Sequence, residues 1–339
     1  ERLAGEVPAG ATATPYAWSL LEFCQKGMLP YLFALDPGSQ MIQFVTEDVT
    51  ERLKRYAAGQ EGPHVYLPPG EAAGDWDPLA ARGTVEGLEA DGRVRVETLD
   101  ELAQYVSDML LGEHWGRHHA QGTVQAFIRR LRGALRHVRH LVRGDLPPRE
   151  LERARLDPLA SSDMVHVIDI HDLHSVAQAF VVGVVLRDVF DQREAAARSP
   201  GTVYVVLDEL NKYAPAQEES PIKETLLDIA ERGRSLGVIL IGAQQTASEV
   251  ERRVVSNAAI RVVGRLDMAE AARPEYRFLP STLQERAGIL SPGSMIVHQP
   301  DLPVPLLVTF PFPAWATRGS EVARPGSADS EFDDLIPLE

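Results

Sequence analysis

A strand–helix–strand pattern in the middle of the chain constrains the fold more than any other feature. The stretches "TVYVVLDEL" (202–210) and "VILIGAQ" (238–244) are continuous apolar runs, and "SPIKETLLDIAERGRSLG" (220–237) between them has a helical pattern. Ser220 stands at the start of this helix and Gly237 at its end, as is common at helix termini. Continuous Val, Ile and Leu runs are typical of parallel strands buried on both faces. The pattern therefore predicts a parallel βαβ unit.

Further strands extend this pattern over most of the chain. Apolar runs predict them at 29–37, 64–68, 164–170, 258–266, 293–299 and 305–310. A helix at 175–195 is apolar on most faces, as a helix that covers a sheet would be. We therefore expect an α/β fold with a mainly parallel central sheet flanked by helices.

Helical segments interrupt the strands. Helices are expected at 15–26, 98–112, 123–143 and 148–155. Gly27 is placed to end the first of them, and Asp100 is the expected N-cap of the second. We interpret residues 98–160 as a helical insertion into the α/β core.

Composition and charge exclude several classes of protein. No apolar run among the 339 residues reaches the roughly 18 needed to span a bilayer, so we expect no membrane association. No signal peptide is apparent, and the single cysteine, Cys24, permits no internal disulfide; we expect it to be buried in a cytoplasmic protein. The net charge of −15 does not predict nucleic-acid binding by the molecule as a whole, although 127–146 is strongly basic.

Two carboxylates end the first strand of the βαβ unit. Asp208 and Glu209 follow the apolar run, at the strand end where open α/β sheets bind ligands. A nucleotide hydrolase needs one carboxylate that holds Mg²⁺ and another that polarises the attacking water. The alternative is that this pair merely ends a strand in solvent.

Polar residues near the second strand favour the hydrolase interpretation. Gln244 ends that strand, where a glutamine can contact a γ-phosphate, although it could also belong to a plain loop. In the last turns of the helix, Arg232 and Arg234 either interact with the helix dipole or provide an arginine finger across a subunit boundary. The order of these residues along the chain is the one expected of a nucleotide hydrolase.

A degenerate phosphate loop lies near the N-terminus. The form GxxxxGK[ST] cradles phosphates with backbone N–H groups, and its counterpart is "VPAGATAT" (7–14). Thr14 supplies the hydroxyl, but Ala13 replaces the lysine. A helix and an apolar run that ends at Asp36 follow it, whereas no strand is apparent before it, so we expect the chain to begin inside a fold. The loop residues are Gly10, Ala11, Thr12, Ala13 and Thr14.

Together these segments resemble the HerA family of hexameric DNA-translocating ATPases, within the HerA/FtsK group of P-loop NTPases. The resemblance covers about residues 7–315 and rests on "GATATPYA", "FALDPG", "VHVIDI", "VVLDELNKYAP", "ERGRSLGVILIGAQQ", "SNAAIRVVGRLD" and "LSPGSMIV". It implies a RecA-like P-loop NTPase core plus a helical-bundle insertion. The implied division is core (1–97), helical bundle (98–160), remainder of the core (161–318) and acidic C-terminal tail (319–339).

The resemblance also implies roles for the site residues, with ATP and Mg²⁺ as cofactors. Asp208 and Thr14 are expected to bind the metal, Glu209 to activate water and Gln244 to act as a sensor. Arg234, with Arg232 beside it, is expected to be the finger in trans. The loop residues and Asp36 are expected to bind the nucleotide.

The implied function is that of an ATPase and DNA translocase or helicase. Family members form homo-hexameric rings that move duplex DNA through a central pore. They act with a NurA-like nuclease in end resection and repair, or with other effector enzymes in antiviral defence. Ala13 leaves open whether this chain hydrolyses ATP, and the usual amino-terminal β-barrel is absent from the sequence. The alternatives are a hydrolysis-deficient scaffold for a nuclease or effector and an ATPase of the conjugation or secretion type.

Arginines in the basic segment suggest a contact with DNA. A helix over 123–143 would place five of them in one stripe along phosphates. The alternatives are a solvated helix face and salt bridges between subunits. The stripe is Arg129, Arg132, Arg136, Arg139 and Arg143.

Overall fold

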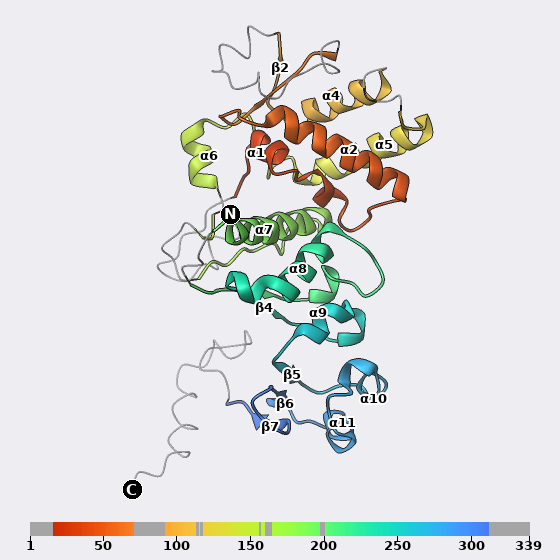
Figure 1. Cartoon of the computed structure of the whole chain (residues 1–339), viewed down its shortest axis with the longest axis vertical. Helices are drawn as coiled ribbons and strands as arrows, with labels where there is room; N and C mark the ends of the chain where they lie inside the picture. The colour runs from red at the N-terminus through yellow and green to blue at the C-terminus, as the bar shows by residue number, and fades with distance from the viewer. Residues whose placement is uncertain are drawn as a thin grey trace, which may run out of the picture. The chain divides into compact units, whose positions relative to one another are not determined.

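Two compact units make up the chain, one ending at Gln245 and the other beginning at Thr246 (Figure 1). The computed structural model describes residues 16–70, 92–112, 115, 118–155, 157–159, 165–196 and 201–311. In the described residues, the first unit contains two separate two-stranded sheets and the second unit contains one three-stranded sheet. Each unit has its own core.

The strand–helix–strand pattern predicted from the sequence forms a parallel strand pair in the first unit. β3 (Val203–Leu207) and β4 (Val238–Gly242) pair in parallel over all five residues. The helix between them, α8 (Pro221–Leu236), starts after Ser220, whose hydroxyl accepts a hydrogen bond from the Lys223 backbone N–H. It ends at Gly237, whose φ of 70° is easily reached only by glycine. The α/β class and the parallel pairing are thus confirmed.

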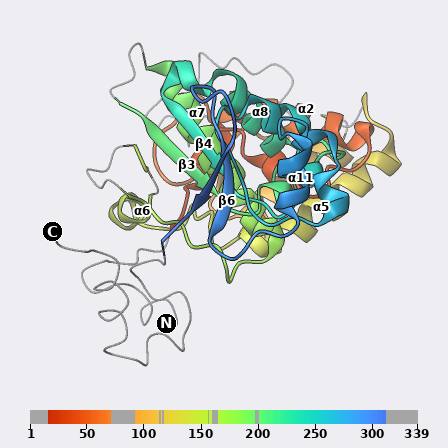
Figure 2. The ribbon, with the colours of Figure 1, turned by 90° about the horizontal axis from the view of Figure 1, so that it is seen from below.

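Helices cover one face of the strand pair in layers. The expectation that these strands are buried on both faces is wrong for the described chain, because Tyr204 and Val206 of β3 are 62% and 70% exposed. α8 packs on β4 and also against α7 (Ser175–Ala195), as Figures 1 and 2 show. We expected α7 to cover a sheet, but its main neighbours are α8, α5 (Gln121–Val138) and the 3₁₀ helix η2 (Leu29–Phe33). Its apolar composition reflects burial between helices on several sides.

A group of helices and a two-stranded ribbon complete the described part of the first unit. Its further helices are α1 (Leu20–Gln25), α2 (Gln40–Ala57), α4 (Leu99–Leu111) and α6 (Pro148–Ala154), and the 3₁₀ helix η6 (Leu210–Lys212) follows β3. The ribbon pairs β1 (Val65–Leu67) with β2 (Val94–Val96) in antiparallel fashion. Helix α5 packs against α2, α4 and α7, so the segment predicted as an insertion shares contacts with the elements before and after it.

The strand predicted at 29–37 is wrong, because the structure forms η2 there. Pro30 explains the difference, since a proline suits the first turn of a helix but removes a hydrogen-bond donor from a strand. Asp36 therefore does not end a strand. It lies exposed after η2, where its Oδ2 contacts Arg130 Nη1 of α5 at 2.7 Å.

Two predictions of helix starts also need correction. α1 begins at Leu20 rather than near residue 15, because Ser19 and Glu22 form a reciprocal capping box. α4 uses Thr98 rather than Asp100 as its N-cap, since the Thr98 hydroxyl accepts from the Glu101 N–H. The described part of the segment predicted as a strand at 164–170 has no strand partner among the described residues, and Val167 is 80% exposed.

The second unit contains an antiparallel sheet in the order β5–β6–β7. Its strands are β5 (Arg261–Val263), β6 (Ser294–His298) and β7 (Leu306–Thr309). The expectation that they continue a parallel sheet is wrong, because the connection from β6 to β7 is shorter than the dozen or so residues that a parallel crossover needs. Its described helices are η7 (Ala247–Glu249), α9 (Arg252–Asn257), α10 (Met268–Ala271), η8 (Pro274–Tyr276) and α11 (Ser281–Ala287).

Aromatic side chains hold α1 against α7 in the core of the first unit. The Phe180 ring lies 5.6 Å from the Trp18 ring and 6.2 Å from the Phe23 ring, measured between centroids. Cys24 is buried beside them, as predicted, and burial raises the pKa of its thiol to about 12. Within the described ranges, no helix combines the length and hydrophobicity that crossing a membrane requires.

Candidate functional site

The carboxyl edge of the β3–β4 pair brings together three of the predicted site residues. Leu207 and Gly242 are paired at the strand ends, so Asp208, Glu209 and Gln244 all follow the same edge. Two backbone hydrogen bonds extend the pairing beyond the strands: Ala243 N–H donates to Leu207 O, and Leu210 N–H donates to Ala243 O, both at 3.0 Å. Two carboxylates and a carboxamide are therefore concentrated at one edge, as the sequence predicted.

Glu209 has an unusual backbone conformation. Its φ of 51° makes it the one non-glycine residue of the described chain in the left-handed region. Its N–H donates to Asp208 Oδ1 at 2.9 Å, and η6 begins directly after it. Such a conformation is unfavourable for a side chain with a Cβ, and it is found most often where a functional group must be held in position.

Lys212 is the residue of this edge that the sequence reasoning missed. Its ammonium forms an ion pair with Glu209 Oε2, and both side chains are about half exposed. The hydrogen bond with Glu209 raises the pKa of Lys212, and the charge of Asp208 adds to the effect. Its position three residues after Glu209 could have revealed it, because one helical turn brings such residues onto the same side.

A magnesium ion fits the chemistry of this edge. In nucleotide sites Mg²⁺ binds one or two carboxylates together with phosphate oxygens and water. Asp208 and Glu209 are exposed and could supply such ligands. Across the described ranges, no group of three or more His, Cys, Asp or Glu side chains could hold a metal ion by itself, so a metal here would depend on the nucleotide.

The two arginines of α8 lie at the opposite edge of the strands. α8 leads into the start of β4, and Val203 N–H donates to Gly237 O at 2.8 Å, so the helix end lies at the amino edge of both strands. Five strand residues, about 17 Å, separate that edge from Asp208. Arg234, in the last turn of α8, therefore lies toward the edge opposite the carboxylates, whereas the Arg232 side chain is held by other partners.

Arg232 and Arg234 differ in their surroundings. Arg232 contacts Glu194 at 2.8 Å and Asp228 at 3.2 Å, and its guanidinium lies over the Phe190 ring at 5.0 Å. These contacts attach α8 to α7. Arg234 is exposed.

Several predicted nucleotide-binding residues are not brought to this edge. The phosphate-loop residues 10–14 lie outside the described residues. Asp36 accepts hydrogen bonds from Arg130 of α5 through its backbone and side-chain oxygens, at 2.9 and 2.7 Å. The structure therefore gives Asp36 a role in joining the end of η2 to α5.

The arginine stripe is shorter than predicted. Arg129, Arg132 and Arg136 are exposed on α5, which ends at Val138, and Arg139 is the exposed C-cap. Arg143 lies beyond the helix, where its N–H donates to Trp18 O and its guanidinium pairs with Asp145 at 2.6 and 2.8 Å. The chain turns after residue 139 to form this contact, which removes Arg143 from the stripe.

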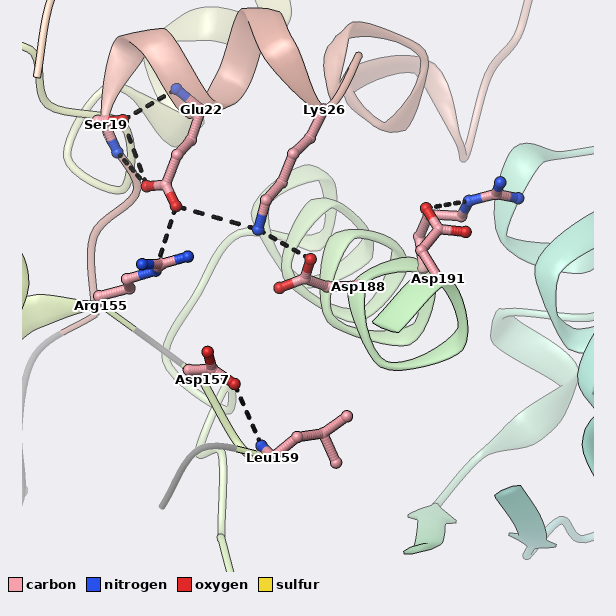
Figure 3. A network of polar contacts seen from close by, with 9 residues as sticks. Ser19, Glu22, Lys26, Arg155, Asp157, Leu159, Asp188 and Asp191 are labelled. Carbon is pink, nitrogen blue, oxygen red and sulfur yellow. Dashed lines mark hydrogen bonds and ion pairs between the residues drawn. The ribbon is translucent and has the colours of Figure 1, made fainter. Parts of the chain in front are cut away.

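A separate cavity of about 460 Å³ lies between the end of α1, α2 and α7. Its charged side chains neutralise one another: Lys26 contacts Asp188 at 2.8 Å, and Lys54 contacts Glu51 at 2.9 Å. Figure 3 shows the continuation of this network, in which Glu22 contacts Lys26 and Arg155. None of the predicted site residues lines this cavity, and the network joins α1 to α7.

In comparisons with known proteins, no family model and no curated protein matches the chain. Among solved structures, similar chains include the bacterial conjugative coupling protein TrwB, in an unbound form (13% identity, TM-score 0.47) and in complex with the GTP analogue GDPNP (12%, 0.48). Each match covers 89% of this chain and 73% of the TrwB chain. The genome packaging NTPase B204 of Sulfolobus turreted icosahedral virus 2, in complex with AMP, matches at 12% identity and a TM-score of 0.32 over 39% of this chain. Matches to B204 span 54% to 66% of its length. TM-scores below 0.5 establish no family for this chain.

Proposed function

We propose that this chain is a nucleotide-binding ATPase subunit whose hydrolytic site is the carboxyl edge of β3 and β4. The observation that carries the proposal is the convergence of Asp208, Glu209 and Gln244 on that edge, with Glu209 held in a left-handed backbone conformation. Carboxylates that follow one parallel strand and a polar residue that follows the adjacent strand are groups that phosphoryl transfer to water uses.

Each group has a distinct chemical task. Asp208 would hold Mg²⁺, with the Thr14 hydroxyl as a second ligand, and Glu209 would accept the proton of the attacking water. Bound Mg²⁺ supplies positive charge that neutralises the phosphates. Gln244 would hydrogen-bond the terminal phosphate, and residues 10–14 and Asp36 would complete the nucleotide site, as the HerA resemblance implies. For Asp36 this role would require the loss of its ion pair with Arg130.

The assembly follows from the position of the arginines. Arg234 lies in the last turn of α8, toward the strand edge opposite the carboxylates, and is exposed, so it would act on a nucleotide bound to a neighbouring subunit. Arg232 is occupied by contacts with α7 and supports the helix instead. This arrangement suits a homo-hexameric ring with ATP between subunits, which is the assembly that the HerA resemblance implies.

The substrate of the ring would be duplex DNA. Exposed arginines on α5 offer positive charge for phosphates in a chain whose net charge is −15. A NurA-like nuclease or another effector would act with the ring, in end resection and repair or in antiviral defence, within a cytoplasmic setting. The residue ranges 1–97, 98–160, 161–318 and 319–339 keep their proposed roles as core, helical bundle, core and tail.

Magnesium-dependent ATP turnover, measured with and without duplex DNA, tests the proposal. The Glu209→Gln variant should lower kcat at least about 100-fold, because it removes the proton acceptor, whereas the exposed Glu218→Gln control should match the wild type. Absence of turnover in both the wild type and Ala13→Lys would contradict the ATPase proposal.

A second candidate is a hydrolysis-deficient scaffold of the same fold, which Ala13 favours. Loss of the lysine removes one positive charge from the phosphate loop but leaves its backbone donors. Turnover that appears only in Ala13→Lys would identify this scaffold. DNA-independent turnover would instead favour protein cargo, as in an ATPase of the conjugation or secretion type.

A further inference from the structure

We propose that Lys212 is a further catalytic residue of this site and supplies the positive charge that a phosphate-loop lysine would otherwise provide. This inference rests on the proposed ATPase function and adds a residue that the HerA resemblance did not assign. It starts from a mismatch of charge: Asp208 and Glu209 are both anionic, nucleotide phosphates are anionic, and position 13 is an alanine. A site of this kind needs a cation besides Mg²⁺.

The lysines of this chain leave one candidate. There are four: Lys26, Lys54, Lys212 and Lys223. Lys26 and Lys54 are paired with Asp188 and Glu51 in the cavity beside α7. The Lys223 side chain is only 3% exposed and donates to Glu218 O and Glu219 Oε1 at the start of α8. Lys212 alone lies beside the carboxylates of β3.

Local backbone structure places Lys212 at the reacting edge. The left-handed Glu209 turns the chain into η6, and Lys212 N–H donates to Glu209 O at 2.9 Å. One turn of this short helix brings the ammonium to Glu209 Oε2.

Lys212 can exchange its contact with Glu209 for a contact with a phosphate when nucleotide binds. Lys212 and Glu209 are 53% and 52% exposed, and exposed ion pairs contribute little to stability because water screens them. A phosphate oxygen offers the ammonium a more concentrated negative charge than a carboxylate does. The transfer of Lys212 to phosphate would also leave Glu209 free to accept a proton from water.

Variants of Lys212 test the inference through nucleotide affinity as well as turnover. Binding of a fluorescent ATP analogue with Mg²⁺ would be measured for the full chain and for Lys212→Ala, Lys212→Arg and Lys54→Ala. We expect Lys212→Ala to weaken affinity and to lower kcat/KM, each about tenfold, as the loss of one charge-assisted hydrogen bond would. Lys212→Arg should keep most of the nucleotide affinity and most of kcat/KM. Lys54→Ala removes a similarly exposed lysine from an ion pair at the same spacing and should match the wild type.

A double-variant comparison shows whether Lys212 replaces the missing lysine. In the Ala13→Lys background, Lys212→Ala should lower nucleotide affinity and kcat/KM by less than threefold each, because the phosphate loop then has its own cation. An equal loss in both backgrounds would overturn the inference, as would unchanged or faster turnover in Lys212→Ala. If the wild type neither binds nor hydrolyses the nucleotide, the proposed function itself fails. Matching thermal unfolding midpoints would show that the variants are folded.

Discussion

At the scale of the residue, Glu209 and Gly242 together define the shape of the candidate site. Glu209 adopts a left-handed backbone conformation, which lets Leu210 fold back toward β4. The Leu210 side chain is 4% exposed and fills the space above Gly242. A Cβ at position 242 would overlap Leu210 Cδ2. A residue with a Cβ at the end of β4 would therefore have to displace Leu210, although the φ of Gly242 is not positive.

Gly242→Ala should therefore destabilise the protein and displace Leu210. The expected loss is about 1–3 kcal/mol in the free energy of unfolding, the usual cost of overpacking a filled site. Chemical denaturation would measure it, with Gly264→Ala as the control because no atom lies within 4 Å of a Cβ built there. An unchanged free energy of unfolding in Gly242→Ala would show that Leu210 does not fill this space.

At the scale of the element, two stacked histidines join the end of α5 to the start of α7. The His137 and His174 rings lie 3.6 Å apart between centroids, with 13° between their planes. His174 Nδ1 accepts from Val176 N–H as the N-cap of α7, and His137 Nε2 accepts from Arg136 Nε. Desolvation, His174 and Arg136 all lower the pKa of His137. The contact therefore favours the neutral form of the His137 ring.

The stability of this junction should fall in mild acid. Since the pKa of His137 is lowered in the fold, the unfolded chain binds a proton first, as pH falls through the ordinary value near 6.5. The stability that depends on neutral His137 is thus present above that value and is lost as pH falls below it. The loss of unfolding free energy between about pH 7.5 and 5.5 should be smaller in His137→Asn than in the wild type. His171→Asn, a change at an exposed histidine outside the stack, should behave as the wild type; equal pH dependence in all three would refute a role for the stack.

At the scale of the whole molecule, charge is distributed unevenly over an acidic chain. The net charge of −15 opposes contact with DNA, yet α5 exposes Arg129, Arg132 and Arg136 on its surface. Arg132 donates to the neutral Gln104, and Arg136 to His137, so neither contact neutralises a guanidinium. Binding through this face would be local and strongly dependent on salt.

Replacing these three arginines by glutamine should weaken binding to a short duplex. It should also reduce the slope of log affinity against log salt by about 3, as expected if each guanidinium contacts one phosphate. Fluorescence anisotropy at several salt concentrations would measure both effects. The same change at Arg273, Arg277 and Arg286, which are exposed in the second unit, is the control. Equal losses in the two triple variants would mean that only net charge matters.

Most of the local elements were predictable from short stretches of sequence. The βαβ unit, its caps at Ser220 and Gly237, and the burial of Cys24 follow from apolar runs, turn residues and composition, which act over a few neighbouring residues. The errors occurred where an apolar run fits two structures. At 29–37 the pattern of a buried strand is also that of a buried 3₁₀ turn, and Pro30 was the signal that distinguishes them.

The sequence by itself determined the order of the site residues and the α/β class, because hydrophobic periodicity and capping are local properties. Only the tertiary structure decided which groups meet. It placed Arg234 toward the strand edge opposite the carboxylates, held Arg232 against α7, paired Asp36 with Arg130 and made the sheet of the second unit antiparallel. It also brought Lys212 to Glu209 through one left-handed residue. Such outcomes depend on strand register, helix direction and backbone turns, which arise from packing across distant parts of the chain.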